Sequence, residues 1–375
     1  MCISPLPQET LDNMKRFKYS YTDDSLLYNK FMSPCLNKLV NYFPTWLAPN
    51  VITLTSLCFN IFASTISFLD GGFDFSHKLN RSTCFVIGLF QLIYQLLDNI
   101  DGKQARRTGN STPFGMLMDH GCDIFTNIFT SYNLSKLLAV GNDDYRSFFV
   151  FFGLILGFYM MTYEEYKLGA MHFPIVNGTD EGNFFIFLLG IFLSIVGHDY
   201  ITYVINEKYS ITIGQLIAFV VLLGGFSCVF NLYLHTYQRK GCKEAAKNFL
   251  DHFPFYAVVI VPNLYICYHL EFYKENKWII LWNACLLFAR VTIDMQVKIL
   301  TMDTLACNIM FVFSNFAFIL PLFSEENTVK LFSLFLLLIA QATELAIFIF
   351  RRAKQITDYL KIRIFCVNNN QPVKL

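Results

Sequence analysis

The sequence predicts an all-α, polytopic integral membrane protein with about ten transmembrane helices and an N-terminal interfacial amphipathic helix. Hydrophobic residues make up 54% of the 375 residues and aromatic residues 17%, whereas charged residues make up 15%. Soluble domains carry about 25% charged residues. The apolar residues form continuous runs of about 20 residues, which is the length that crosses a hydrocarbon core. Because the runs are continuous rather than alternating, the pattern argues against barrel strands.

Charge and cysteine content exclude two broad classes of protein. The net charge of +1 provides no basic field that would attract nucleic acid, so no nucleic-acid partner is predicted. The eleven cysteines are scattered, without a Cys-x-x-Cys pair or a Cys/His cluster. This distribution argues against a zinc site or a disulfide scaffold and fits thiols that stay reduced in a membrane or in the cytosol.

The first predicted element is the interfacial helix, which lies within residues 1–50. Its apolar residues recur at helical spacing, as is typical of a helix that lies on a membrane surface. The stripe consists of Leu27, Phe31, Cys35, Leu39 and Phe43. Pro34 interrupts the pattern, so the sequence leaves open whether the segment forms one helix or two. A plain membrane anchor without a catalytic part explains the same pattern.

Ten apolar runs follow in order along the chain. They cover residues 51–69, 83–99, 115–140, 147–166, 184–204, 212–235, 254–270, 277–298, 306–323 and 329–350. If both termini are cytosolic, the Lys and Arg residues outside these runs are concentrated in the cytosolic segments, as the positive-inside rule requires. This orientation also places the loop between the second and third runs on the cytosolic side.

That loop and the helices beside it carry the most informative residues of the chain. Asp98 and Asp101 are one helical turn apart, so both can face the same point. Gly115, Asp119 and Asp123 follow at intervals of four and form one stripe at the start of the third run. Gly115 has no side chain and leaves room above the two carboxylates. A solvated loop cap explains any single aspartate here, but the full pattern predicts a functional site.

Four carboxylates held close together repel one another and need compensating positive charge. Hard divalent cations supply it, and Mg²⁺ or Mn²⁺ typically serves where phosphate is also bound. Two such ions about 3.5–4 Å apart clamp a pyrophosphate. Other residues of the loop suit phosphate. Gly102 and Ala105 have small side chains that leave room for a ligand. The guanidinium of Arg106 offers N–H donors in a fixed planar arrangement, and Lys103 adds positive charge.

The pattern D-x2-D-G-x2-A-R-x8-G-x3-D-x3-D resembles the signature of the CDP-alcohol phosphatidyltransferases. Every fixed position is present, namely Asp98, Asp101, Gly102, Ala105, Arg106, Gly115, Asp119 and Asp123. The stretches "DGKQARRT", "MDHGCD", "PTWLAPNVITL" and "FPIVNGTDEG" are similar in particular to the eukaryotic choline/ethanolamine phosphotransferases. The resemblance covers residues 25–185 well and, beyond them, only the number of spans.

This resemblance implies an enzyme that transfers phosphocholine or phosphoethanolamine from CDP-choline or CDP-ethanolamine to diacylglycerol and releases CMP. The implied division is a cytosolic N-terminal segment at 1–50, catalytic helices at 51–205, further transmembrane helices at 206–350 and a cytosolic tail at 351–375. Two Mg²⁺ or Mn²⁺ ions would be held by Asp98, Asp101, Asp119 and Asp123. The CDP-alcohol would contact Asn50, Gly102, Lys103, Ala105, Arg106 and Gly115. A helix N-cap explains Asn50 equally well.

A lipid hydroxyl is a weak nucleophile, so its proton needs an acceptor. His120 adjoins Asp119, and its ordinary pKa of about 6.5 suits proton transfer near neutral pH. The resemblance implies that His120 is the base and that Glu181 assists it. Packing beside Asp119 also explains His120, and a loop carboxylate also explains Glu181. Much of the wider family lacks the histidine, which leaves Asp123 as the competing base.

The resemblance also implies a homodimer in the endoplasmic reticulum or the Golgi, surrounded by membrane lipids and with its active site facing the cytosol. Three alternatives remain at this point. Another CDP-alcohol phosphatidyltransferase, such as one that uses inositol, is disfavoured by ten spans and the DHGCD stretch. A divalent-cation transporter would carry acids deep in several spans. An inactive scaffold would not need the intact motif.

Charged residues also occur inside two later runs. Arg290 and Asp294 are four residues apart in the eighth run, which predicts an internal ion pair. Glu344 in the tenth run has no partner that the sequence identifies. A subunit interface and a polar cavity both remain open as its environment.

Overall fold

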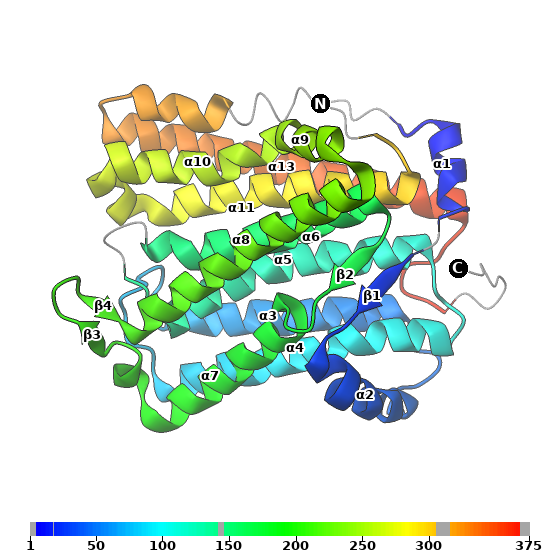
Figure 1. Ribbon diagram of the computed structural model, residues 1–375, viewed down its shortest axis with the longest axis horizontal. Helices are drawn as coiled ribbons and strands as arrows, with labels where there is room; N and C mark the ends of the chain where they lie inside the picture. The colour runs from blue at the N-terminus through cyan, green and yellow to red at the C-terminus, as the bar shows by residue number, and fades with distance from the viewer. Residues whose placement is uncertain (1–4, 18, 142–145, 305–315, 368–375) are drawn as a thin grey trace.

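The computed structural model describes residues 5–17, 19–141, 146–304 and 316–367. Its long helices run side by side in one bundle (Figure 1). They are α3 (Pro49–Leu69), α4 (Arg81–Arg107), α5 (Pro113–Leu137), α6 (Arg146–Leu168), α7 (Asn183–Val196), α8 (Ile213–Lys240), α10 (Phe253–Tyr268), α11 (Leu270–Thr301) and α13 (Asn327–Leu360). The prediction of an α-helical integral membrane protein is confirmed.

Seven helices within the described ranges are long and apolar enough to cross a membrane. They correspond to α3, α4, α6, α8, α11, α13 and the helical segment Gly178–Val196, which contains α7. The predicted number of about ten is therefore not confirmed. Helix α10 has 16 residues, and the predicted run at 306–323 falls mostly outside the described residues.

Helix α5 forms at the run predicted for residues 115–140, but it is not among the seven helices of the described ranges that are apolar enough to cross a membrane. It contacts α3, α6 and α11, and its C-terminal half includes the buried polar residues Thr130, Ser131, Asn133, Ser135 and Lys136. Neighbouring helices rather than lipid surround this helix, so its side chains need not be apolar. A helix with many buried polar side chains therefore packs against three neighbouring helices inside the bundle.

Short elements gather at the two ends of the bundle (Figure 1). At one end lie α1 (Gln8–Met14), β1 (Tyr21–Asp23), η1 (Tyr28–Met32), α2 (Ser33–Leu39), η2 (Val40–Tyr42), β2 (Met171–Phe173) and α9 (Cys242–Asp251). Strand β1 pairs in parallel with β2, with Thr22 opposite His172. At the opposite end β3 (Val204–Asn206) pairs antiparallel with β4 (Ile211–Thr212). The remaining short turns are η3 (Gly178–Gly182), η4 (His198–Tyr200) and η5 (Leu320–Phe323).

The predicted interfacial segment forms one continuous run of helical turns from η1 through α2 to η2. Pro34 lies in the first turn of α2, directly after the π-helical turn η1, and does not interrupt the run. Met32, Leu36 and Val40 face inward and pack with Ile52 and Ile100. The predicted apolar stripe lies largely outward, with the side chains of Phe31 and Leu39 exposed. The location of this stripe on a membrane surface stays a prediction.

Glycines bring two pairs of helices into backbone contact. A Cβ atom on Gly88 of α4 would lie 2.8 Å from the carbonyl oxygen of Phe187, close to Gly190 of α7. A Cβ atom on Gly225 of α8 would lie 2.5 Å from the carbonyl oxygen of Gly153 in α6. Small residues at such crossings let membrane helices approach closely without the hydrophobic effect. These contacts fix α6 and α4, which both contribute to the site described below.

A buried group of charges joins α11 to α13. Arg290 is paired with Asp294 at 3.5 Å, which confirms the predicted pair. The sequence left the partner of Glu344 open, and the structure supplies one, because Arg290 Nε also donates to both carboxylate oxygens of Glu344, at 3.0 and 2.9 Å. Lys298 is paired with Asp294 at 3.2 Å, so charges of both signs compensate one another.

We expect Gly225→Ala to destabilise the α6–α8 crossing, because the new methyl group would meet backbone that cannot move aside cheaply. Such overpacking costs about 1–3 kcal/mol, which outweighs a gain in helix propensity of about 1 kcal/mol. Thermal unfolding of the purified protein in detergent measures the effect. Gly224→Ala is the matched control, since no atom lies within 4 Å of its new Cβ. Equal or higher unfolding temperatures for both variants would contradict this interpretation of the crossing.

Candidate metal and phosphate site

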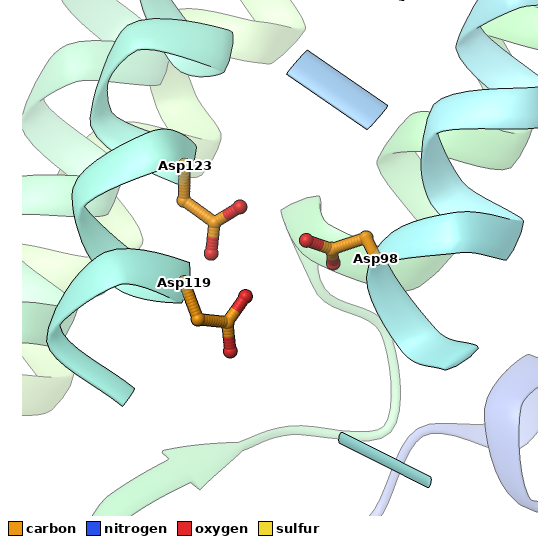
Figure 2. Close-up of side chains that lie close together, drawn as sticks. All are labelled: Asp98, Asp119 and Asp123. Carbon is orange, nitrogen blue, oxygen red and sulfur yellow. The ribbon is translucent and has the colours of Figure 1, made fainter. Parts of the chain in front are cut away.

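Three aspartates from two helices converge at the site. Asp119 and Asp123 lie on successive turns of α5 and point toward Asp98 on α4 (Figure 2). One carboxylate oxygen from each lies within 4.8 Å of the others, a separation at which one ion can contact all three. Asp101, one turn beyond Asp98, interacts electrostatically with Asp98, Asp119 and Asp123. The structure therefore brings three of the four predicted ligands, Asp98, Asp119 and Asp123, within reach of one ion, and Asp101 lies one turn away from this group.

Local sequence fixes the start of α5 at the position that this geometry requires. Thr112 caps the helix, and its Oγ1 accepts a hydrogen bond from the N–H of Gly115 at 2.9 Å. Pro113 follows in the first turn, where proline is favoured. A Cβ atom on Gly115 would lie 3.2 Å from Thr112 Oγ1 and 3.5 Å from Asn50 Oδ1. The absence of a side chain at Gly115 thus lets Thr112 and Asn50 approach the first turn of α5 closely.

Two hydroxyl groups orient the outer pair of carboxylates. Thr53 of α3, which is fully buried, donates a hydrogen bond from Oγ1 to Asp101 Oδ2. Tyr94, one turn before Asp98 on α4, donates to Asp123 Oδ1 at 2.9 Å. Each carboxylate retains a second oxygen for another ligand. The donors fix side-chain direction but bring no positive charge.

The negative charges of these carboxylates repel one another, and a bound divalent cation would neutralise them. Asp98 Oδ1 is buried and has no hydrogen-bond donor among the described residues. An ionised oxygen in that position is costly unless a cation meets it. An all-oxygen set of carboxylates is the donor chemistry that Mg²⁺ and Mn²⁺ prefer. The residues present therefore match the expected metal, although the identity and number of ions do not follow from them.

His120 lies on α5 beside this cluster but faces α11. Its Nδ1 is 3.2 Å from Gln296 Oε1, and its ring meets the ring of Tyr19 edge-on at 5.7 Å. Glu165 of α6 is buried nearby and interacts electrostatically with His120. Burial and the charges of nearby carboxylates, with Glu165 first, raise the pKa of the Tyr19 hydroxyl above its usual range. A neutral phenol from the N-terminal segment therefore covers the imidazole.

Glu181 has a different set of partners. Its Oε1 accepts hydrogen bonds from Ser25 Oγ at 2.8 Å and from the N–H of Leu27 at 3.1 Å. Its Oε2 accepts from the N–H of Asn177 at 3.0 Å. These bonds tie η3 to the chain between β1 and η1. No hydrogen bond joins Glu181 to His120 in the part of the chain that the structure describes.

The basic residues of the motif divide between two faces of α4. Lys103 is buried and donates to Ser33 Oγ at 3.1 Å and to Asn37 Oδ1 at 2.8 Å, both in α2. Arg107 donates to the carbonyl oxygens of Val40 and Phe43. Both side chains therefore hold the N-terminal segment.

Arg106 is the basic residue that remains available for phosphate. Its side chain is exposed and makes no hydrogen bond or ion pair with any described residue. A Cβ atom on Gly102 would lie 3.6 Å from Arg106 Nη1, so the guanidinium lies over this glycine. Ala105 is partly buried beside it.

The N-cap interpretation of Asn50 was wrong. The N-cap of α3 is Ala48, and Pro49 occupies the first helical position. Asn50 instead donates from Nδ2 to the carbonyl oxygen of Ile364, at 2.8 Å, while its Oδ1 faces Gly115. The C-terminal segment after α13 therefore reaches the start of α3, beside the space above the aspartates.

Several residues around the site were not found from the sequence. Thr53, Tyr94, Gln296, Glu165 and Tyr19 all contact the predicted residues or interact with them electrostatically. Tyr94 carried a local signal, because it lies four residues before Asp98 and hence on the same face of α4. The others come from segments distant in the sequence, and no spacing rule connects them to the motif.

We expect Lys103→Met to loosen the N-terminal segment, because it removes two partly buried hydrogen bonds to α2. Hydrogen–deuterium exchange over residues 33–43 should speed up several-fold in this variant. Arg106→Met removes the same charge from the neighbouring exposed face and serves as the matched control, with exchange as in the wild-type protein. Identical exchange in the two variants would contradict the assignment of Lys103 to the N-terminal segment.

Comparison with known proteins agrees with this geometry. The family described as CDP-alcohol phosphatidyltransferase matches residues 46–289. The chain is 28% identical to the uncharacterized CDP-alcohol phosphatidyltransferase class-I family protein 2 of Dictyostelium discoideum, over 96% of this chain and 88% of that one. It is 34% identical to choline/ethanolaminephosphotransferase 1 of Arabidopsis thaliana, over 50% and 47% of the two chains. It is 35% identical to cholinephosphotransferase 1 of Saccharomyces cerevisiae, over 47% and 44%.

The matches with the two phosphotransferases therefore span about half the length of each relative. The family match spans more of this chain and includes every residue of the aspartate cluster. The chain belongs to the CDP-alcohol phosphatidyltransferase family of membrane-embedded enzymes of phospholipid biosynthesis.

Proposed function

We propose that the protein transfers phosphocholine or phosphoethanolamine from CDP-choline or CDP-ethanolamine to diacylglycerol and releases CMP. The observation that carries this proposal is the convergence of Asp98, Asp119 and Asp123, with oxygens within 4.8 Å of one another, next to His120 in a membrane bundle. The names of the relatives from Arabidopsis and yeast supply the substrate class. Membrane lipids surround the enzyme and provide its acceptor.

Two divalent ions, Mg²⁺ or Mn²⁺, are proposed as cofactors, with Asp98, Asp101, Asp119 and Asp123 as their ligands. When bound, such ions neutralise negative charge that develops on the two phosphates. Thr53 and Tyr94 hold Asp101 and Asp123 in their orientations, so the ligand oxygens are arranged before an ion arrives. The buried oxygen of Asp98 has no other positive partner.

The proposed CDP-alcohol site lies above Asp119. Arg106 offers a free guanidinium to phosphate oxygens. Gly102 and Ala105 have small side chains or none, so a ligand can approach the backbone of α4 on this face. Gly115 lets Asn50 lie close to the start of α5, on which Asp119 follows one turn later. Lys103 contributes indirectly here, since its hydrogen bonds hold α2 rather than a ligand.

In the proposed reaction the diacylglycerol oxygen attacks the phosphorus that carries the choline or ethanolamine. The bond from this phosphorus to the CMP oxygen breaks, and CMP leaves with the electron pair. His120 accepts the hydroxyl proton. With Gln296 Oε1 as acceptor, Nδ1 of His120 carries the hydrogen and Nε2 keeps a lone pair for this purpose. Gln296 and Tyr19 position the ring, and the buried carboxylate of Glu165 interacts with it electrostatically.

Glu181 is proposed to assist His120 through the N-terminal segment. Its carboxylate fastens Ser25 and Leu27, immediately after β1, and β1 carries Tyr21, whose ring stacks on Tyr19 at 5.4 Å. Loss of Glu181 would release the strand whose neighbour Tyr19 covers His120. Glu181 is therefore a positioning residue in this proposal.

The decisive experiment incubates the purified protein with CDP-choline or CDP-ethanolamine, diacylglycerol and Mg²⁺, and measures CMP. We expect release of CMP and formation of phosphatidylcholine or phosphatidylethanolamine. Competition between the two CDP-alcohols determines the preferred headgroup. Product formation only with inositol and a CDP-activated lipid would overturn the substrate assignment. Movement of divalent ions across proteoliposomes without transfer would instead favour a transporter.

We expect His120→Ala to lower turnover by about 10²–10⁴, the usual contribution of a general base, while the affinity for the CDP-alcohol stays nearly unchanged. A cation on Asp123 suppresses the basicity of that carboxylate, whereas the imidazole remains free to accept a proton. Nucleotide binding and turnover are measured separately for His120→Ala and Asp123→Asn. If His120→Ala turns over normally, the base is elsewhere, and Asp123 becomes the candidate.

Both termini and the active site are proposed to face the cytosol, in the endoplasmic reticulum or the Golgi. The bias of Lys and Arg toward one side supports this orientation. In variants that retain one cysteine, a membrane-impermeant maleimide should modify exposed Cys242 in sealed microsomes. An Asp199→Cys variant, at the opposite end of the bundle, should react only after permeabilisation. The reverse labelling pattern would invert the orientation.

A homodimer is proposed from the family resemblance. Mass measurement of the protein in native lipid discs tests it, with a mass of twice the chain expected. A single chain of full activity would show that the site does not need a partner.

A further inference from the structure

A cavity of about 280 Å³ lies deeper in the bundle than the aspartates. Helices α3, α5, α6 and α11 form its walls, and a loop residue, Phe73, contributes to it. Its lining includes Phe68, Phe129, Tyr132, Phe151, Trp282 and Cys285. The ring centroids of Phe129 on α5 and Trp282 on α11 are 6.1 Å apart in an edge-to-face arrangement, so these two side chains contact each other in the cavity wall.

The few polar groups of this cavity are satisfied by the protein itself. Ser64 and Thr65 donate to carbonyl oxygens one turn earlier in α3, at 3.0 and 2.9 Å. The Tyr132 hydroxyl donates to the carbonyl oxygen of Gly72 at 2.6 Å. A cavity lined in this way offers water no partners and takes apolar guests instead. Its volume is roughly twice the ~150 Å³ that accommodates one benzene molecule in an engineered apolar cavity.

The cavity reaches the outer surface of the bundle beside α3. Ile61 and Phe68 both line it, and they are 38% and 48% exposed. Helix α3 is one of the membrane-spanning helices, so lipid is the medium at this surface. A hydrocarbon chain can therefore enter the cavity without passing through water.

All four helices of the wall also carry residues at the reaction site, namely Thr53 on α3, Asp123 on α5, Glu165 on α6 and Gln296 on α11. Helix α5 carries Asp123 and, nine residues later, Tyr132, which is about 13 Å along a helix axis. Helix α11 carries Gln296 and, eleven residues earlier, Cys285, which is about 16 Å away along its axis. One leaflet contributes about 15 Å of the hydrocarbon core. A lipid whose hydroxyl lies beside His120 would place the far part of one acyl chain at this depth.

We propose that this cavity binds the distal part of one acyl chain of the lipid acceptor and sets which chain lengths the enzyme uses. The inference rests on the proposed transfer to diacylglycerol and adds a second contact region for that substrate. Cys285 forms a small part of the wall, and Phe129 and Trp282 form its bulky parts. The volume left between them limits how much chain is accepted.

The test fills the cavity with Cys285→Phe and compares two acceptors. Dioctanoylglycerol has short chains that end before the cavity, whereas dioleoylglycerol has chains long enough to enter it. We expect the KM for dioleoylglycerol to rise about tenfold, which corresponds to the loss of about two buried methylene groups. The KM for dioctanoylglycerol and for the CDP-alcohol should stay unchanged. Cys267→Phe makes the same replacement at an exposed position of α10 and should change neither acceptor.

The opposite change is Phe129→Ala, which enlarges the cavity and should shift the preferred acceptor toward longer or bulkier chains. Thermal unfolding of each variant checks that the fold is retained. Equal effects of Cys285→Phe on both acceptors, or no effect on either in a folded protein, would overturn the proposal. So would an unchanged acceptor preference in folded Phe129→Ala.

A second readout does not require transfer. Diacylglycerol with a photoreactive group at the end of one acyl chain should label the peptide that contains Trp282 and Cys285, and Cys285→Phe should reduce this labelling. Labelling without CMP release in the wild-type protein would contradict the proposed reaction but support the binding of an acyl chain in the cavity. CMP release without such labelling would do the reverse.

Discussion

The mutual repulsion of four aspartates, held by helix spacing on α4 and α5, is the constraint on which the rest of the site depends. Carboxylates this close in a partly buried setting remain ionised only if positive charge meets them. The protein supplies hydroxyl donors from Thr53 and Tyr94, which orient the side chains without neutralising them. The fold thus prepares a place for cations and leaves the neutralisation to them.

Keeping that place open explains much of the surrounding structure. The backbone contacts at Gly88 and Gly225 fix α4 and α6 against their neighbours. The opposite face of α4 uses Lys103 and Arg107 to hold the N-terminal segment. That segment returns across the site and places Tyr19 on His120. One short motif therefore supplies both the aspartates of the site and the basic residues, Lys103 and Arg107, that hold the N-terminal segment over it.

The sequence predicted the helical membrane class, the aspartate cluster and the Arg290–Asp294 pair, because each rests on spacing within one helix or on local composition. It did not predict the partner of Glu344, since that contact joins residues 54 positions apart. The contact of His120 with Gln296 spans 176 positions and was equally inaccessible. The run predicted at 115–140 does form α5, although this helix is not among the seven in the described ranges that are apolar enough to cross a membrane. Lys103 was assigned to phosphate from its charge alone, although its buried environment makes it a donor to α2.

The most direct test of the central constraint is the effect of divalent cations on stability. Anything that binds the folded state stabilises it, so Mn²⁺ should raise the unfolding temperature of the wild-type protein relative to chelator. Asp98→Asn removes one of the repelling charges. It should therefore unfold at the same or a higher temperature than the wild-type protein in chelator, and should lose most of the response to Mn²⁺. A wild-type protein that unfolds at one temperature with and without Mn²⁺, and an Asp98→Asn variant that is less stable in chelator, would contradict the role of these aspartates as a cation site.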